Sequence, residues 1–393
     1  MRTNPLLGVI GALLLLGFHP DVAAQETGET DSLWWVYIGT YTGGDSEGIY
    51  LLHFDAASGL LENKGLACAV ENPSFLALHP ARPLLYAVGQ MRDADGRTGG
   101  AVSAFAINPA DGRLVSLNTQ SSIGRGPCHV VVDPTGRHVA VANYSGGSVA
   151  VLPIMEDGRL GAAACHIQHE GSSVHPQRQQ APFAHSVTFD AAGHFLFAAD
   201  LGADKIFVYR FDADRGILEP NTPPSTTLAP GAGPRHFAFH PNGRFAYAVN
   251  ELDNTVTAFA YDADSGRLDT LHSISTLPED FSEENTTAEI RVHRSGRFLY
   301  ASNRGHDSIA AFAIDEETGR LTALGQTSTG GRTPRNFNVD PTGRFLLAAN
   351  QTTNNVVVFR IDQNNGRLEA AGYEVEVPTP VCVLFVRPVS EGR

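Results

Sequence analysis

Three arginines, a histidine and a glutamate are the residues of this sequence best suited to chemistry. They are His185, Arg235, Glu251, Arg304 and Arg335. The planar guanidinium group of arginine binds a carboxylate or phosphate through paired hydrogen bonds. Imidazole and carboxylate groups can accept and return a proton. In a chain with a formal net charge of −14, this combination indicates a site for a small anionic substrate.

A second group of polar residues belongs beside the first. We expect His129, His236, Glu289 and Arg291 just inside the same site, where they and Arg335 would bind substrate. Each position also has a structural explanation. A single arginine at such a place can be solvated or can bridge a neighbouring carboxylate, and the two histidines can pack inside a layer of strands. The clustering, more than any one residue, favours a functional site.

Other chemistries find little support. The sequence contains no G-x-S-x-G nucleophile motif and no phosphate-binding P-loop. His166, His169 and His175 share one irregular stretch, but their spacing matches no metal site. We therefore expect no metal and no cofactor. The four cysteines form no C-x-x-C pattern, and we expect four buried free thiols.

The composition indicates a folded protein with a substantial core. Of the 393 residues, 42% are hydrophobic and 18% are charged, which excludes a disordered chain. The 28 basic residues are outnumbered by 42 acidic residues and form no cluster. We therefore expect no nucleic-acid partner. The sequence carries no indication of the oligomeric state.

A short motif returns about every fifty residues and defines the elements that must position these side chains. Its pattern is His or Asp, Pro, any residue, Gly, Arg, as in Asp133–Arg137, His240–Arg244 and Asp340–Arg344. Each copy lies between short apolar strands, and an Asp-rich turn leads to a fourth strand. Four short strands per unit of this length are typical of a propeller blade. A β-solenoid is the alternative, but its repeats are shorter and more regular.

Six complete units and two split ends predict a seven-bladed, all-β propeller with four antiparallel strands per blade. Residues 381–386 match a first strand, while residues 37–40 and 49–54 match second and third strands. We expect both termini to build one blade, which closes the ring and leaves no free edge. Residues 25–393 would form this single domain.

The repeat also predicts where the polar residues meet. The first strand of each blade begins five residues before the turn, and the second strand ends eleven residues after it. Because neighbouring strands are antiparallel, these two positions share one face of the disc. One mouth of the central channel should therefore collect residues from both positions. The first-strand position holds Ser74, Cys128, His185, Arg235, Ala288, Arg335 and Cys382, and the second-strand position holds Gln90, Tyr144, Leu201, Glu251, Arg304 and Gln351.

The N-terminus has the pattern of a secretory signal peptide. Arg2 precedes an apolar stretch from Leu6 to Phe18, and Val22-Ala23-Ala24 places small residues before a cleavage site. The apolar stretch is shorter than the ~20 residues that a membrane-spanning helix needs. We predict a signal peptide over residues 1–24, no membrane span after its removal, and export to a bacterial periplasm. An uncleaved anchor is the alternative.

The motifs resemble those of a known family, the seven-bladed propeller lactonases. This family includes propeller-type 6-phosphogluconolactonases and fungal carboxymuconate cyclases. The resemblance covers roughly residues 34–388 and includes Gly126-Pro-Cys-His129, Ala184-His185, Gly233-Pro-Arg-His236, Asn250-Glu251 and Asn303-Arg304. It implies that His185, Arg235, Glu251 and Arg304 are catalytic. The chain departs from the family pattern at Phe183, Gly89-Gln90 and Arg291.

The resemblance favours a lactone hydrolase similar to 6-phosphogluconolactonase. Its substrate would be an anionic lactone or sugar lactone, and Glu251 or His185 would activate water. Two alternatives remain open at this point. A muconate-type cycloisomerase needs the same anion-binding arginines and a proton donor, and a propeller can also bind a ligand without catalysis.

Overall fold

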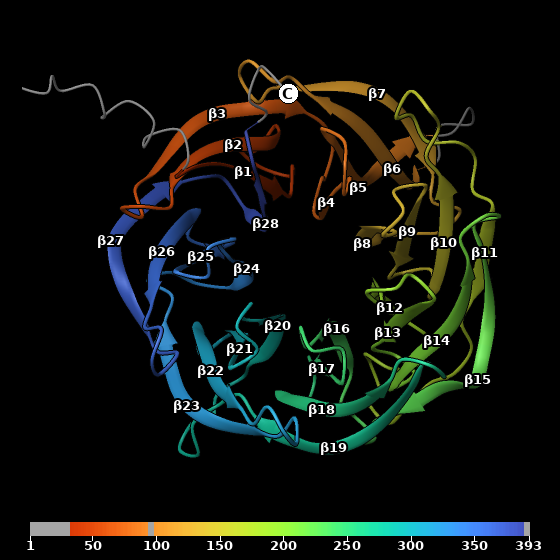
Figure 1. Ribbon diagram of the computed structural model, residues 1–393, viewed down its shortest axis with the longest axis vertical. Helices are drawn as coiled ribbons and strands as arrows, with labels where there is room; N and C mark the ends of the chain where they lie inside the picture. Colours follow the sequence, from red (N-terminus) through yellow and green to blue (C-terminus); the bar gives the residue numbers. More distant parts are fainter. Residues whose placement is uncertain (1–31, 93–97, 389–393) are drawn as a thin grey trace, which may run out of the picture. The chain divides into compact units, whose positions relative to one another are not determined.

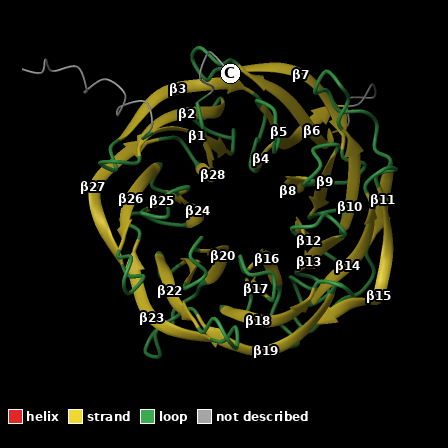
Figure 2. Ribbon diagram, viewed as in Figure 1, coloured by secondary structure: helices red, strands yellow, loops and turns green. Residues whose placement is uncertain are grey.

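The computed structural model describes residues 32–92 and 98–388, and from Leu33 onward these residues form a seven-bladed β-propeller. Seven four-stranded antiparallel sheets surround a central channel (Figure 1). Every regular element of the described residues is a strand (Figure 2). The predicted all-β propeller is therefore confirmed. The signal peptide predicted over residues 1–24 lies outside the described residues, which contain no helix capable of crossing a membrane.

The strands of each blade follow one another from the channel to the rim (Figure 1). The innermost strands are β4 (Leu76–Leu78), β8 (Pro127–Val132), β12 (Ala184–Phe189), β16 (Pro234–Phe239), β20 (Thr286–Val292), β24 (Pro334–Val339) and β28 (Pro380–Val386). The second strands are β1 (Leu33–Thr40), β5 (Leu84–Arg92), β9 (His138–Asn143), β13 (Phe195–Asp200), β17 (Phe245–Asn250), β21 (Phe298–Arg304) and β25 (Phe345–Asn350).

The two outer strands complete each sheet. The third strands are β2 (Gly48–Asp55), β6 (Thr98–Ile107), β10 (Ser148–Pro153), β14 (Lys205–Asp212), β18 (Thr255–Asp262), β22 (Ser308–Ile314) and β26 (Asn355–Ile361). The outermost strands are β3 (Leu61–Ala69), β7 (Leu114–Ser121), β11 (Cys165–Gln168), β15 (Ile217–Thr227), β19 (Arg267–Ser275), β23 (Leu321–Ser328) and β27 (Leu368–Glu376).

Burial explains why the sequence pattern differs between strands. A second strand such as β17 is packed on both faces, and all of its residues are buried. An outermost strand such as β19 has many exposed residues and polar side chains. The core lies between adjacent blades, where Phe197 of β13 and Phe237 of β16 stack with ring centroids 5.4 Å apart. Each buried large side chain of this kind contributes about 1.5–3 kcal/mol.

Both termini build one blade, as predicted. Strand β28 pairs with β1, placing Ile38 opposite Val383 and Tyr37 opposite Leu384. Strand β1 continues to β2 and β3 in the same sheet. This pairing supplies the inner edge of β1 with a partner and closes the ring.

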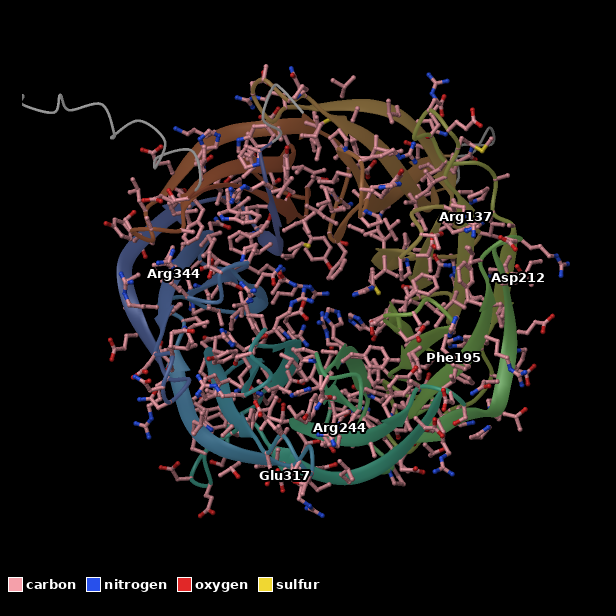
Figure 3. The ribbon with its side chains drawn as sticks, in the orientation of Figure 1. Arg137, Phe195, Asp212, Arg244, Glu317 and Arg344 are labelled. Atoms are coloured by element: carbon pink, nitrogen blue, oxygen red, sulfur yellow. The ribbon has the colours of Figure 1, made fainter. Side chains whose placement is uncertain are left out.

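The recurring turn connects neighbouring blades as well as neighbouring strands. In one copy, both the Asp133 carboxylate and the left-handed backbone of Gly136, at φ 73°, shape the turn. In another, the Nε2 atom of His240 lies 2.8 Å from the carbonyl oxygen of Gly296 in the next copy. The turn arginines Arg137, Arg244 and Arg344 lie away from the central channel (Figure 3).

The cysteines agree with only part of the prediction. All four are free thiols, but only Cys382 is buried, and Cys68, Cys128 and Cys165 are partly exposed. Cys128 is accessible because it lies at the start of an innermost strand, where it lines a cavity in the channel.

Candidate active site

Bulges at the start of the innermost strands aim side chains into the channel. In the blade built by both termini, pairing with the second strand skips Val381. In four further blades it skips a single residue at the predicted first-strand position, and these residues are Cys128, His185, Arg235 and Arg335. A β-bulge leaves its extra residue outside the regular ladder and redirects its side chain. In three of these four blades a proline precedes the bulge, where its missing N–H is tolerated at the strand start. The predicted first-strand position thus coincides with a distortion of the backbone.

Three of these residues and the ends of the second strands border one cavity of about 500 Å³, which we call the mouth cavity. Arg235 lies beside it, in a small space that it shares with His185 and Arg335. Ser74, Cys128, His185 and Arg335 contribute from the first-strand position. Gln90, Tyr144, Glu251 and Arg304 contribute from the second-strand position. Of the residues at the two predicted positions, these eight lie together at one mouth of the channel, whereas Arg235, Ala288, Cys382, Leu201 and Gln351 do not border this cavity.

Glu251 is the electrostatic centre of the mouth cavity. Its Oε2 atom lies 2.9 Å from Nε of Arg235 and 2.9 Å from a guanidinium nitrogen of Arg304. Its Oε1 atom lies 2.5 Å from Arg178. Burial alone would raise the pKa of Glu251, but Arg304, Arg235 and Arg178 outweigh it and lower this pKa to about 2. The carboxylate is therefore a weak proton acceptor near neutral pH.

The arginines on Oε2 are held by the backbone as well. Arg235 is 2% exposed and donates to the carbonyl oxygen of Ala288 at 2.6 Å. Arg304 donates to the carbonyl oxygen of Thr287 at 2.7 Å. Burial, reinforced by the nearby Arg304 and Arg335, lowers the pKa of Arg235 to about 9. Both guanidinium groups are therefore rigidly positioned charges.

His185 contacts the cavity without an ion pair. Its Nδ1 atom lies 3.8 Å from the sulfur of Cys128, and its ring packs against Tyr144 with centroids 5.1 Å apart. Burial, with the charges of Arg235 and Arg335 nearby, holds the pKa of His185 well below its ordinary value. The imidazole is consequently neutral at neutral pH, with a nitrogen able to accept a proton.

Arg335 brings a further positive charge to the mouth cavity. Its guanidinium group stacks over the Tyr41 ring at 5.4 Å from the centroid. Within residues 32–92 and 98–388, no carboxylate forms an ion pair with it. The guanidinium group can therefore offer its hydrogen-bond donors to an anion.

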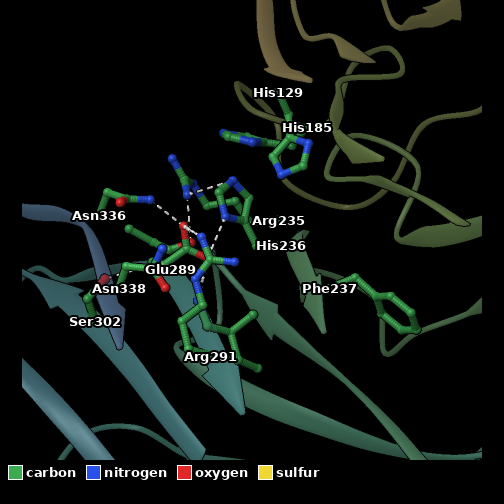
Figure 4. A network of polar contacts seen from close by, with 12 residues as sticks. His129, His185, Arg235, His236, Phe237, Glu289, Arg291, Ser302, Asn336 and Asn338 are labelled. Atoms are coloured by element: carbon green, nitrogen blue, oxygen red, sulfur yellow. Dashed lines mark hydrogen bonds and ion pairs between the residues drawn. The ribbon is translucent and has the colours of Figure 1, made fainter. Parts of the chain in front are cut away.

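The second predicted group lies deeper and reaches the other end of the channel. Glu289 is 1% exposed and is surrounded by His236, Asn336 and Arg291 (Figure 4). Burial opposes ionisation of Glu289, yet Arg291 and His236 lower its pKa to about 2. The His129 ring lies 5.1 Å from that of His236.

These residues line a different cavity, of about 580 Å³, which we call the far cavity. His129, His236, Glu289 and Arg291 contribute to it, and its other walls are mainly apolar residues of the innermost strands. Those strands run from the mouth cavity to the far cavity: Cys128 lines the first, and Val130 to Val132 line the second. His129, His236, Glu289 and Arg291 therefore do not border the mouth cavity. His236 nevertheless joins the two predicted groups, because its Nε2 atom lies 3.2 Å from the Arg235 guanidinium group and its ring centroid lies 5.3 Å from that of His185.

A family model described as lactonase, 7-bladed beta-propeller, matches residues 35–385. The chain belongs to the seven-bladed β-propeller lactonase family. It is 40% identical over 353 residues to the 6-phosphogluconolactonase of Bacillus subtilis, covering 90% of this chain and 98% of that protein. It is 34% identical to the 6-phosphogluconolactonase of Formosa agariphila, covering 77% and 86%.

A solved structure extends this relationship. The periplasmic gluconolactonase of Pseudomonas aeruginosa is 36% identical, with a TM-score of 0.84, and the match covers 91% of this chain and 100% of that one. The present lactonase-family chain therefore shares sequence and fold with these relatives over nearly its whole propeller.

Sequence reasoning missed one charged residue of this lactonase, Arg178. It lies outside the fifty-residue repeat, in the connection 169–183 between β11 and β12, so alignment of the copies could not reveal it. The available signal was the unusual length of that connection, which holds an arginine in an acidic protein. Tyr144, which the repeat placed at this mouth without a role, accepts a hydrogen bond from Arg178 through its hydroxyl at 3.2 Å.

The histidines of the same connection have structural contacts. Nδ1 of His169 lies 2.7 Å from the Asp200 carboxylate, and both side chains are fully buried. Nδ1 of His175 accepts from the backbone N–H of Arg178 at 3.2 Å. Across the described part of the lactonase, no group of three or more His, Cys, Asp or Glu side chains could hold a metal ion.

Proposed function

We propose that this protein hydrolyses an anionic sugar lactone in the mouth cavity. The observation that carries the proposal is the arrangement around Glu251, where Arg178, Arg235 and Arg304 meet a single carboxylate beside the neutral His185. Such a cavity attracts an anion and offers a proton acceptor at the same place. Membership of the lactonase family and the names of the relatives support hydrolysis over muconate cyclisation or binding alone.

The reaction begins with a water molecule attacking the lactone carbonyl carbon. Negative charge then develops on the carbonyl oxygen, and fixed guanidinium donors stabilise it. Arg304 suits this role because it borders the cavity and its position is set by the Thr287 carbonyl and by Glu251. The bond from the carbonyl carbon to the ring oxygen breaks, and a hydroxy acid is formed.

His185 is the better candidate for the base. Both oxygens of Glu251 are occupied by arginines, and its pKa of about 2 makes it a poor proton acceptor. Burial and nearby arginines lower the pKa of His185 as well, but among the described residues no arginine occupies its ring nitrogens. The imidazole can therefore take the proton from water and return it to the leaving ring oxygen. A bound anion would offset the nearby arginines and raise the proton affinity of the imidazole. Glu251 would then hold Arg235 and Arg304 in place.

We also propose export to the periplasm. Support comes from the signal-like pattern of residues 1–24 and from similarity to a protein described as a periplasmic gluconolactonase. Mass spectrometry of the protein recovered from the periplasmic fraction would test this. An N-terminus at Gln25 is expected, whereas an intact Met1 in the cytoplasm would contradict it.

The test of the activity is a hydrolysis assay against spontaneous lactone opening. The purified protein should accelerate hydrolysis of gluconolactone 6-phosphate, and His185→Gln should lower kcat by about a hundred-fold or more, within the range of a positioned general base. Arg137→Ala is the matched control, since this turn arginine pairs with Asp214 outside the channel. Equal rates with and without protein across a panel of lactones would refute the proposal.

A further inference from the structure

The connection 169–183 is fixed firmly above the mouth cavity. It leads from the outermost strand β11 to the innermost strand β12 and is longer than the equivalent connections 122–126, 228–233 and 329–333. Its first residue, His169, is tied to Asp200. Near its other end, the fully buried Gln179 donates to the Leu201 carbonyl at 2.9 Å and to the Asp204 carboxylate at 2.7 Å.

These contacts fix the backbone beside Arg178. The N–H groups of Gln177 and Arg178 donate to Nδ1 of His175 at 3.3 and 3.2 Å. The backbone N–H of Gln179 donates to the His175 carbonyl at 3.0 Å. The Arg178 side chain, by contrast, is 37% exposed and extends to the mouth cavity. A rigid backbone thus presents a side chain that can move.

Arg178 differs from the other two arginines on Glu251. Arg235 and Arg304 both contact Oε2 and also donate to backbone carbonyls. Among the residues that the structure describes, Arg178 donates from its side chain to Oε1 of Glu251 and to the Tyr144 hydroxyl. If Arg178 moved away, Glu251 would keep two cationic partners and would not become an unpaired buried charge.

Space and charge both favour such a movement. Arg178 borders the mouth cavity and also a neighbouring cavity of about 370 Å³. Among the described residues, three arginines line the mouth cavity, Arg178, Arg304 and Arg335, and one carboxylate does, that of Glu251. The excess of positive charge is unmatched until an anion enters. A phosphate or carboxylate accepts two hydrogen bonds from one guanidinium group.

We propose that Arg178 determines substrate specificity by exchanging Oε1 of Glu251 for the anionic substituent of the lactone. The proposal rests on the proposed lactonase function and assigns to Arg178 the distinction between anionic and neutral lactones. The exchange also exposes Oε1 of Glu251 as a hydrogen-bond acceptor for a substrate hydroxyl.

Kinetics on three lactones test this assignment. Neutral gluconolactone, its 6-phosphate and a lactone with a free carboxylate are compared with the parent protein, Arg178→Ala and Arg178→Lys. In Arg178→Ala, kcat/KM for at least one anionic lactone should fall by about ten- to a hundred-fold, mainly through KM. The kcat/KM of Arg178→Ala for neutral gluconolactone should stay within about two-fold of the parent value. Arg178→Lys should restore only part of the lost kcat/KM, because lysine lacks the planar guanidinium group that forms paired hydrogen bonds.

Arg125→Ala is the matched control. Arg125 is exposed on the equivalent connection 122–126, and its guanidinium group contacts the Ser145 carbonyl at 3.4 Å. All three substrates should be unaffected by this change. If only the 6-phosphate loses activity in Arg178→Ala, Arg178 binds phosphate; if only the carboxylate-bearing lactone does, it binds carboxylate; a loss on both means that it binds either group.

Two results would overturn the assignment. An equal loss on neutral and anionic lactones would mean that Arg178 merely supports Glu251, and no loss on any of them would mean that it does not contact substrate. Calorimetric measurement of 6-phosphogluconate binding tests anion recognition by Arg178 independently of lactonase activity. If the parent hydrolysed no lactone, the proposed function would fail. Weaker 6-phosphogluconate binding by Arg178→Ala would still support anion recognition, and equal binding would refute it.

Discussion

The two ends of the central channel are similar in size but differ in the arrangement of their charges. The mouth cavity has a volume of about 500 Å³ and the far cavity about 580 Å³. At the mouth, arginines outnumber the carboxylate that they share. At the far end, Arg291 and Glu289 form one ion pair among apolar walls. Cavity volume therefore does not distinguish the two ends, whereas the local charge balance does.

The difference arises from the geometry of seven similar strands. At the mouth, bulges turn His185, Arg235 and Arg335 away from the regular ladder, and the ends of second strands add Glu251 and Arg304. Toward the far cavity, the same strands resume regular pairing with residues such as Val130 and Phe237. Irregular backbone thus concentrates polar side chains at the mouth, and regular backbone leaves most of the far end apolar. Glu289 is an exception, because it borders the far cavity from a bulge between Thr287 and Ile290.

The largest effect is expected from Arg235→Ala. This change removes an ion pair to Glu251 and the hydrogen bond to the Ala288 carbonyl from a buried position. With each charge-assisted hydrogen bond contributing about 1.5–3 kcal/mol, kcat/KM should fall by about a hundred-fold or more, and the melting temperature should also drop. Steady-state kinetics and thermal unfolding measure the two effects. Unchanged activity would remove the mouth cavity from the mechanism.

Arg304→Ala should have a smaller, mainly kinetic effect. Arg304 lines the mouth cavity. When it is replaced by alanine, Glu251 still has ion pairs with Arg235 and Arg178. We expect kcat/KM to fall by about ten- to a hundred-fold, with partial recovery in Arg304→Lys. A full recovery with lysine would show that charge alone, without the guanidinium geometry, is sufficient.

The layer between the cavities should make stability depend on pH. Burial lowers the pKa of His236 from its ordinary value of 6.5 to about 4. Between these values the unfolded chain binds a proton that the folded chain does not, so stability is lost as pH falls from 6.5 toward 4. The free energy of unfolding should decrease by up to about 3 kcal/mol from this residue.

Urea unfolding of the parent and of His236→Gln across this pH range would measure the contribution. The variant should lose less stability on acidification, while the exposed His194→Gln serves as the matched control. Parallel curves for the parent and His236→Gln would show that His236 contributes nothing to the pH dependence.

The smallest effect on catalysis is expected at the far cavity. Arg291→Ala removes a partly exposed arginine that lies 3.4 Å from Glu289, while His236 and Asn336 still contact that carboxylate. We expect kcat/KM to change by less than about two-fold. If Arg291→Ala and Arg304→Ala were equally damaging, the functional distinction between the two ends would be wrong.

The sequence by itself determined the repeating elements of this protein. Turn residues and alternating apolar residues act over short distances, so each copy reports its own four strands, and the split blade follows from unmatched strands at both ends. The antiparallel order of strands was also enough to bring Glu251 and His185 to one mouth. These are local properties that every copy shares.

Only the tertiary structure decided how the copies face one another across the channel. It placed Glu289 and Arg291 at the far cavity. Each residue advances about 3.3 Å along a strand, so residues further along an innermost strand lie deeper in the channel than the residue at its start. It also brought Arg178, from a connection outside the repeat, to Glu251, a residue in another blade. Such contacts depend on the curvature and closure of the whole ring, which no spacing within a single repeat encodes.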